Sequence, residues 1–261
     1  MLSLDIGATG MLAQQMHVNV ISNNIANMST AGYKRQRPEF QDLIYQNQKR
    51  PGATSSDVGT LVPSGIQVGL GVKTGAIYRI MEQGSFEVTT NELDVAIAGR
   101  GFFQIQTPNG ETAYTRAGNF GLNADGDIVT SQGYLLEPNI NIPEDAQDTI
   151  INASGEVLVK LPGQVAYANQ GQIQLAMFAN EGGLEAIGDN LFMETESSSS
   201  PTTGNPGEDQ FGRLEQGIVE NSNVDAVEEI TRLITAQRAY EMNSKVIQTS
   251  DEMMGTVSNM R

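Results

Sequence analysis

The sequence predicts an α+β protein in which helices at the two ends of the chain flank a central, mainly antiparallel β region. Apolar residues recur every seven positions near each end of the chain, and neither stretch contains Pro, which predicts two long helices. Between them, short apolar runs alternate with turn residues about every 8–12 positions, which is typical of an antiparallel sandwich or barrel. We therefore divide the chain into an N-terminal helix at 1–32, an extended linker at 33–65, a β-rich domain at 66–220 and a C-terminal helix at 221–261.

The composition argues against several functional classes. The 261 residues include 15 Lys and Arg against 31 Asp and Glu, a formal net charge of −16, whereas binding to nucleic acid or to anionic lipid requires basic residues. The chain has no Cys, which excludes disulfides, thiolate metal sites and thiol catalysis. The N-terminal residues lack the basic and apolar regions of a secretory signal, so we expect any export to follow another route.

The N-terminal helix is predicted over about residues 3–28. Leu4, Met11, Val18 and Ile25 form its apolar stripe at intervals of seven. Gly32 follows at the exit, where a residue with positive φ commonly ends a helix.

The linker at 33–65 differs in character from both of its flanks. Residues 33–63 hold five of the fifteen cations and three of the nine prolines. Phe40, Leu43 and Ile44 could form one short helical turn, but residues 46–64 show neither a helical nor a strand period. By itself this stretch predicts an extended or flexible segment.

Strands in 66–220 are predicted from apolar runs bounded by turns. The runs at 94–99 and 102–107 are separated by glycine, and Pro108-Asn109-Gly110 then leads into 113–116, which indicates a hairpin. Residues 194–207 are rich in Ser, Thr and Gly and predict a surface loop. Further strands are expected at 128–129, 150–151, 157–161, 173–178 and 191–193.

The C-terminal helix carries a second apolar stripe. Its members, again seven residues apart, are Ala226, Leu233, Tyr240, Ile247 and Met254. Neither stripe has a neighbouring helix in the sequence, and isolated helices are marginal in water. We expect the two helices to pack on each other and, to cover both stripes, on neighbouring copies of the chain. Gln237, Asn243 and Ser244 beside the stripe could fix the register of a helical seam, or they could be ordinary solvent-facing side chains.

No pattern in the sequence predicts an enzyme, a metal site or a cofactor site. His17 is the only histidine, so it has no second His or Cys with which to hold a metal, and we interpret it as a helix-face residue. The turn NADGD at 123–127 departs from the spacing of a calcium loop, and we interpret it as a β-turn. We therefore expect no catalytic residue, no metal and no cofactor.

Four motifs resemble those of the flagellar rod and hook axial proteins. The N-terminal motif is NNIANMSTAGYKR (23–35), and the C-terminal motif is SNVDAVEEITRLITAQRAYEMNSKVIQTSDEM (222–253). Between them lie LDVAIAGRGFFQI (93–105) and AYTRAGNFGLNADGDIVTSQGYLL (113–136). The motifs follow the family's order and together span nearly the whole chain. Within the family, the length and an insertion at 45–64 most resemble the distal-rod group, whereas hook proteins are considerably longer.

This resemblance implies a structural protein that assembles helically into a hollow tube. Its terminal helices would pair as a coiled coil in the inner wall, with the β domain outside. The subunits would leave the cytoplasm unfolded through the flagellar type III export apparatus, without a cleaved signal, and form a rod that spans the periplasm and carries motor torque to the hook. The implied partners are other copies of the chain, proximal rod proteins, the hook protein, the surrounding L and P ring proteins and the rod cap during assembly, but no nucleic acid.

The resemblance also marks three groups of residues. The helix-exit motif comprises Asn23, Asn24, Ala26, Asn27, Gly32, Tyr33, Lys34 and Arg35. The coiled-coil and subunit interface comprises Leu4, Met11, Val18, Ile25, Leu233, Gln237, Arg238, Tyr240, Asn243, Ile247 and Met254. The insertion, which we expect to lie against neighbouring subunits and to stiffen the tube, includes Tyr45, Gln46, Arg50, Pro51 and Pro63.

Two alternatives remain open. A proximal-rod or hook-type member of the same family would share the four motifs. An acidic, β-rich binding module presented on a coiled-coil stalk would account for the composition and the stripes, but not for four family motifs in order. The unpartnered stripes also predict that the terminal helices are disordered in the monomer, which should then be no more than about a third helical.

Overall fold

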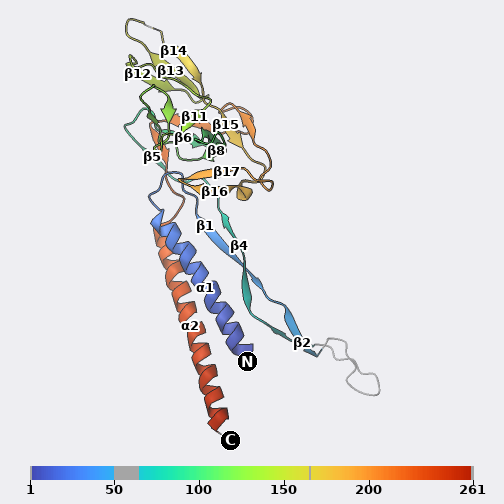
Figure 1. Cartoon of the computed structure of the whole chain (residues 1–261). Coiled ribbons are helices and arrows are strands. Elements are labelled where there is room, and N and C mark those ends of the chain that lie inside the picture. The colour runs from blue at the N-terminus through green and yellow to red at the C-terminus, as the bar shows by residue number, and fades with distance from the viewer. Residues whose placement is uncertain (1, 50–64, 165, 260–261) are drawn as a thin grey trace. The chain divides into compact units, whose positions relative to one another are not determined.

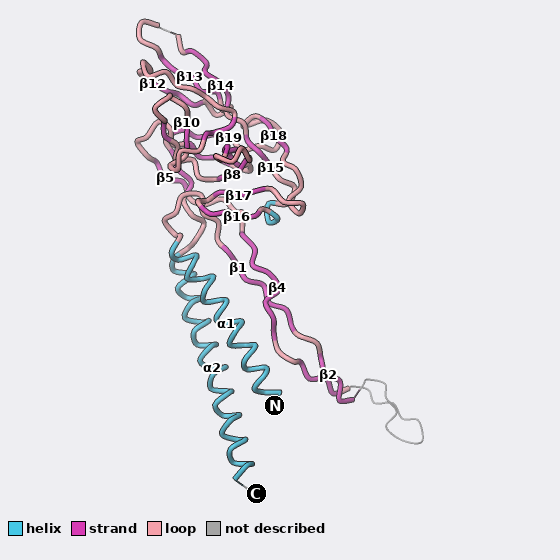
Figure 2. The backbone as a smooth tube through the Cα atoms, in the orientation of Figure 1, coloured by secondary structure: helices cyan, strands magenta, loops and turns pink. Residues whose placement is uncertain are grey.

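The computed structural model describes residues 2–49, 65–164 and 166–259 (Figure 1). Its contacts divide the chain into two compact units, each of which gathers distant parts of the sequence. The helix unit contains residues 1–25, 36–78 and 225–261, and the β unit contains residues 26–35 and 79–224. Two long helices and a central antiparallel β region confirm the predicted α+β class (Figure 2).

The two helices lie close to where the apolar periodicity placed them. Helix α1 runs over Leu2–Ala26 and helix α2 over Ala226–Asn259. Asp225 caps α2, because its Oδ1 accepts the amides of Val227 at 2.8 Å and Glu228 at 3.0 Å. Gly32 has a φ of 68°, as expected for the exit from α1.

The helix unit also contains two short antiparallel ribbons, each with one strand in the predicted linker at 33–65 and one at the start of the predicted β-rich domain. In one, β1 (Gln36–Asp42) pairs with β4 (Val72–Arg79), and in the other, β2 (Tyr45–Lys49) pairs with β3 (Ile66–Gly69). The helical turn expected around Phe40 is wrong, because Phe40 lies in β1. Pro38 and Phe40 point inward at alternate positions, but the alternation is too short for the sequence to show it. Pro38 is tolerated because a two-stranded ribbon consists of edge strands alone.

A nine-stranded sheet forms the largest part of the β unit. Its main path has the order β16-β17-β8-β7-β11-β10-β9, and β15 joins β7 to β18. The predicted hairpin is confirmed, since Gln106 pairs with Thr112 across the turn. The strands are β7 (Phe102–Gln106), β8 (Thr112–Thr115), β9 (Gly121–Leu122), β10 (Ile128–Val129), β11 (Leu135–Glu137), β15 (Leu175–Met177), β16 (Glu185–Gly188), β17 (Leu191–Met193) and β18 (Thr202–Gly204).

Smaller sheets complete the β unit. They are β12 (Asp148–Ile151), β13 (Glu156–Lys160) and β14 (Ala168–Gln172) as one sheet, β6 (Val95–Ala98) with β19 (Arg213–Gln216), and β5 (Phe86–Val88) with β20 (Ile218–Glu220). Strand β18 lies within the predicted surface loop, because the polar residues of that loop pair with the apolar β15. One apolar core joins the nine-stranded sheet, the β12–β14 sheet and the β6–β19 pair, and it includes Phe103, Ile105, Leu136, Val157 and Leu175. A second cluster stacks Phe102, Tyr114, Phe178 and Phe192 edge to face.

Candidate functional site: the helix pair and a buried junction

Helices α1 and α2 contact each other through small and polar residues. The Ser250 hydroxyl donates to Ser3 Oγ at 3.2 Å near one end of the pair, and Asn24 Nδ2 donates to Glu229 Oε2 at 3.1 Å near the other. The helices are therefore antiparallel. A Cβ atom added at Gly7 would lie 2.9 Å from Ile247 Cγ1, so Gly permits a close approach of the two backbones.

Residues at the contact between the helices, here called the seam, also recur every seven positions, but at other positions than the predicted apolar stripes. On α1, Ser3, Gly10 and Asn24 lie one position before Leu4, Met11 and Ile25 of the predicted stripe. On α2, the corresponding residues are Glu229, Ala236, Asn243 and Ser250. Glu229, Ala236 and Ser250 are buried. A heptad of small and polar residues is the signal that would have located the seam.

Most of the predicted interface residues fall beside this seam. Of that group, Asn243 and Ile247 lie at the helix contact, opposite Gly10 and Gly7. The half-buried members are Leu4, Met11, Val18, Ile25, Leu233, Asn243, Ile247 and Met254, and the exposed members are Gln237, Arg238 and Tyr240. Val18, Gln237 and Tyr240 line a hollow of about 340 Å³ on the helix pair.

Helix α2 carries a second apolar face that the sequence analysis missed. Ile234 is 46% exposed, and it lies two positions from the buried Ala236, which places it about 200° around the helix. On α1, Leu12 is 66% exposed on the side away from Asn24 and Gly10. The exposed large apolar residues of the two helices are Ile6, Leu12, Met16, Val227, Ile230, Ile234, Tyr240, Met242, Val246, Met253 and Val257. Large apolar patches on a protein surface are typical of interaction sites, so these residues are candidates for one.

Asn24, from the predicted helix-exit motif, ties three elements of the helix unit together. Its side-chain amide exchanges two hydrogen bonds of 2.9 Å with the backbone of Gln36, so it pairs with the first residue of β1 as a strand would. The same amide reaches Glu229, whose other oxygen accepts Arg232 Nη1 at 3.2 Å. Of the remaining members, Asn23 and Ala26 are exposed, and Asn27, Tyr33 and Arg35 are half-buried.

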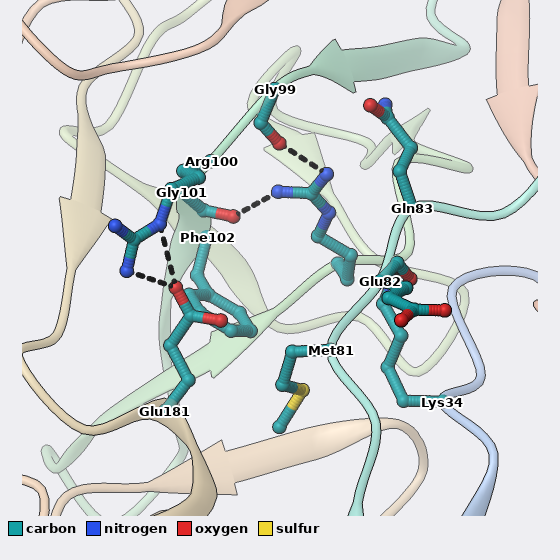
Figure 3. Close-up of a pocket in the computed structure, with 10 residues that line it drawn as sticks. Lys34, Met81, Glu82, Gln83, Gly99, Arg100, Gly101, Phe102 and Glu181 are labelled. Atoms are coloured by element: carbon teal, nitrogen blue, oxygen red, sulfur yellow. Dashed lines mark hydrogen bonds and ion pairs between the residues drawn. The ribbon is translucent and has the colours of Figure 1, made fainter.

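Lys34, also from the helix-exit motif, belongs to a buried ion cluster in the β unit. Its Nζ lies 2.6 Å from Glu220 Oε1, and Arg116 Nε lies 2.7 Å from Glu220 Oε2. The side chains of all three residues are at most 6% exposed. Arg116 also donates to the carbonyls of Gly99 and Gly101, which Figure 3 shows as dashed lines. The Glu220 carboxylate, two residues before the C-terminal motif, thus binds Lys34 of the N-terminal motif and Arg116 of a central motif.

The charges of the cluster explain its protonation. Burial alone raises the pKa of Glu220, but Arg116 and Lys34 outweigh burial and hold the pKa below its ordinary value. Burial lowers the pKa of Lys34, and Arg116 adds to that effect while Glu220 opposes it. Two cations share one carboxylate, so the cluster favours the charged form of Glu220 and penalises that of Lys34.

A hollow of about 480 Å³ in the β unit borders the cluster. It is lined by Lys34 and Arg116, and its apolar lining includes Met81 and Phe102 (Figure 3). Across it, Arg100 Nη2 pairs with Glu181 Oε1 at 2.8 Å, with the Arg100 side chain 57% exposed. The cations that line this hollow are occupied by carboxylates and carbonyls, so the geometry indicates a structural junction.

His17 and the NADGD turn lie where the sequence analysis placed them. His17 is half-buried on α1, with its ring edge-to-face to Phe40 at 6.1 Å. Burial, followed by the nearby Arg232, lowers the pKa of His17. Asn123 Oδ1 accepts the amides of Asp125 and Asp127, which closes the turn between β9 and β10. In the described part of the chain, no three acidic or histidine side chains gather as metal ligands, and no helix there is long and apolar enough to span a membrane.

Known protein families match this chain along its length. Residues 4–34 match the family described as flagella basal body rod protein, residues 96–159 match the D1 domain of the flagellar hook protein FlgE/F/G, and residues 215–260 match the C-terminal region of flagellar basal body rod FlgEFG proteins. The flagellar basal-body rod protein FlgG of Caulobacter vibrioides is 60% identical over 261 residues, which is all of both chains.

This chain belongs to the flagellar basal-body rod protein family.

Proteins of the same name in two other bacteria are also similar to this chain. The flagellar basal-body rod protein FlgG of Agrobacterium fabrum is 52% identical over 99% of this rod protein and 98% of the relative. The protein of that name in Bacillus subtilis is 41% identical over 99% of this rod protein and 98% of the relative. The C-terminal matched region contains α2, and the N-terminal one contains Lys34 and all of α1 except its first two residues. The resemblance seen in the sequence is therefore confirmed, and the chain is a structural subunit of the flagellar rod.

Proposed function

We propose that this rod protein forms the distal part of the rod, in which copies polymerise into a hollow shaft that transmits motor torque to the hook. In this assembly α1 and α2 pair as a coiled coil in the inner wall, and the β unit lies outside. The distal assignment is supported by the full-length similarity to proteins named FlgG and by the insertion at 45–64.

The proposal rests mainly on one observation. Small and polar residues lie between the two helices, and large apolar residues on the same helices are exposed. Ile234, Met242 and Val246 are exposed on α2, and Ile234 lies nearly opposite the buried seam residue Ala236. A helix that is apolar on two faces is stable in water only when both are covered. Neighbouring copies of the same helix pair supply such cover, because each presents the same apolar face.

The rest of the proposal concerns export and partners. The subunit leaves the cytoplasm unfolded through the flagellar type III export apparatus, without a cleaved signal, and crosses the periplasm only as part of the rod. Proximal rod proteins, the hook protein, the L and P ring proteins and the rod cap are its partners. The absence of Cys supports this route, because a chain without thiols cannot form wrong disulfides on entering an oxidising compartment.

The insertion is proposed to stiffen the shaft by lying against neighbouring subunits. Tyr45 and Gln46 are exposed residues of β2, so their side chains are available to another copy. Arg50, Pro51 and Pro63 lie outside the described residues. The division of the chain at residues 32, 65 and 220 remains a proposal for the assembled protein. Among the described residues, 36–49 and 65–78 belong to the same contact unit as the helices.

The assembly proposal is tested with Ile234→Asp in cells that lack their own copy of the protein. A buried carboxylate without a partner is costly, so we expect loss of rods from isolated basal bodies and loss of swimming, with the variant still exported. Ile187→Asp is the matched control, because Ile187 is also 46% exposed but lies in the β unit. Normal numbers of rods containing Ile234→Asp would contradict assembly through this face.

A further inference from the structure

Three segments of the β unit meet at the side chain of Asn223. Its Oδ1 accepts the backbone amide of Arg35 at 2.7 Å. Its Nδ2 donates to the carbonyl of Ile80 at 2.9 Å and to that of Glu82 at 3.0 Å. The Ile80 amide donates to the Arg35 carbonyl at 2.9 Å, so the first two segments are also bonded to each other.

These are the segments through which the chain passes between its two units. Arg35 is followed by residue 36 of the helix unit, Ile80 comes one residue after the passage at 78–79, and Asn223 comes one residue before the passage at 224–225. The chain makes four such passages in all. The side chain of Asn223 therefore links the segments at three of these four passages, one of which is its own.

The ion cluster around Glu220 bonds the same segments independently of Asn223. Lys34, next to Arg35, donates to the Glu82 carbonyl at 2.8 Å and pairs with Glu220. Glu220 Oε1 also accepts the amide of Gly84 at 2.9 Å. Buried ion clusters contribute little net stability compared with apolar packing, and their best-attested role is to specify one geometry. The cluster and Asn223 together define a single arrangement of the three segments.

Asn suits this position for a chemical reason. Its short amide offers one acceptor oxygen and two N–H donors in one plane, which matches one backbone amide and two carbonyls. Asp lacks the donors, and Ala lacks both functions. We propose that Asn223 is a positioning residue that fixes the spacing of the three connections, so that load passes between the units through a defined path. This inference rests on the proposed function as a torque-bearing subunit, but its molecular core can be measured on the isolated protein.

Hydrogen exchange on the full-length protein tests the positioning role. In Asn223→Ala, we expect the amides of Arg35 and Ile80 to exchange at least about tenfold faster, because their partners are lost or loosened. The amides of Phe103 and Ile105 in the core should be unchanged. In Asn223→Asp, the acceptor for the Arg35 amide is retained, so that amide should stay protected. Asn221→Ala is the matched control, because among the described residues its side chain bonds only the exposed Glu87 carboxylate, and its backbone amide still donates to the Ser85 carbonyl.

Three results would decide against the inference. Unchanged exchange at Arg35 in Asn223→Ala would show that the side chain does not hold the segment. An equal acceleration at Phe103 and Ile105 would show a loss of general stability instead of positioning. Equal acceleration in Asn221→Ala would show that the effect is not specific to Asn223.

A second measurement connects the residue to load. Cells with Asn223→Ala should build rods in wild-type number, but their isolated basal bodies should break within the rod at lower shear than those with Asn221→Ala. Rods of normal shear resistance would overturn the mechanical part of the inference. Absence of the wild-type chain from rods would instead contradict the proposed function, while the exchange result would still decide the positioning role.

Discussion

Glu220 carries its charge in a fully buried position between Lys34 and Arg116. Removing one partner of a buried ion pair leaves the other charge without compensation, and here two cations would lose their carboxylate. Glu220 also accepts the Gly84 amide, so its replacement would also remove a hydrogen bond from the segment that begins at residue 79. At the scale of single residues, the β unit depends on this one carboxylate.

Replacement of Glu220 by Gln should lower the free energy of unfolding by about 3–5 kcal/mol at pH 7. Urea unfolding followed by tyrosine fluorescence measures this, since the chain has seven Tyr and no Trp. Glu181→Gln breaks the exposed pair with Arg100 and should cost less than about 1 kcal/mol. A loss in Glu220→Gln no larger than in this control would contradict the importance of the cluster.

The same comparison has a definite pH dependence. The pKa of Glu220 is lower in the folded protein than in the unfolded chain, so its stabilising contribution is complete above the ordinary glutamate pKa of about 4.3. It is lost as the pH falls through the lower, folded value. The difference between the wild type and Glu220→Gln should therefore be constant near neutrality and shrink only in acid.

At the scale of elements, α1 and α2 are long helices with a weak seam. Their contacts include Ser3 with Ser250 and Asn24 with Glu229, which bury little apolar surface, and most helical stability in proteins comes from such burial. Leu12 and Met242 are instead exposed by about two thirds. The pair by itself is therefore marginal, and its stability depends on what covers the outer apolar faces.

We predict that the helices are largely disordered in dilute monomer and form on polymerisation. The sequence-based limit of one third helix cannot test this, because α1 has 25 residues and α2 has 34, together less than a quarter of the 261. Circular dichroism should show far fewer than 59 helical residues in the monomer and a rise toward that number in the polymer. A dilute monomer with the full helical signal would contradict coupling between folding and assembly.

At the scale of the whole molecule, residues 50–63 of the insertion can be removed without removing the β2–β3 ribbon. Lys49 pairs with Ile66, so deletion of residues 50–63 leaves Ser64 and Gly65 as a two-residue turn between β2 and β3. We expect rods with this deletion to be exported and assembled but to bend more than wild-type rods in electron micrographs. Replacement of the segment by Gly and Ser at equal length separates specific contacts from mere length. Equally straight rods from both variants would contradict the stiffening role.

Local patterns in the sequence account for much of the architecture. Heptad spacing located both helices to within a few residues, and apolar runs with turns located the β7–β8 hairpin and most central strands. The motifs at the two ends and in the centre identified the family. Such features depend on residues close together in the chain, so the sequence alone determines them.

The tertiary structure decided which residues meet across long distances in the chain. Lys34 pairs with Glu220 across 186 positions and Asn24 with Glu229 across 205, and no period in the sequence links such positions. The apolar stripes predicted an apolar contact between the helices. In the structure, Ser3, Gly7 and Gly10 of α1 lie at that contact, because only small residues permit so close an approach. Part of the predicted linker forms β1 and β2, whose partners β4 and β3 lie 17 or more residues further along the chain. Contacts of this kind are set by packing and buried hydrogen bonding, which exist only once the chain has folded.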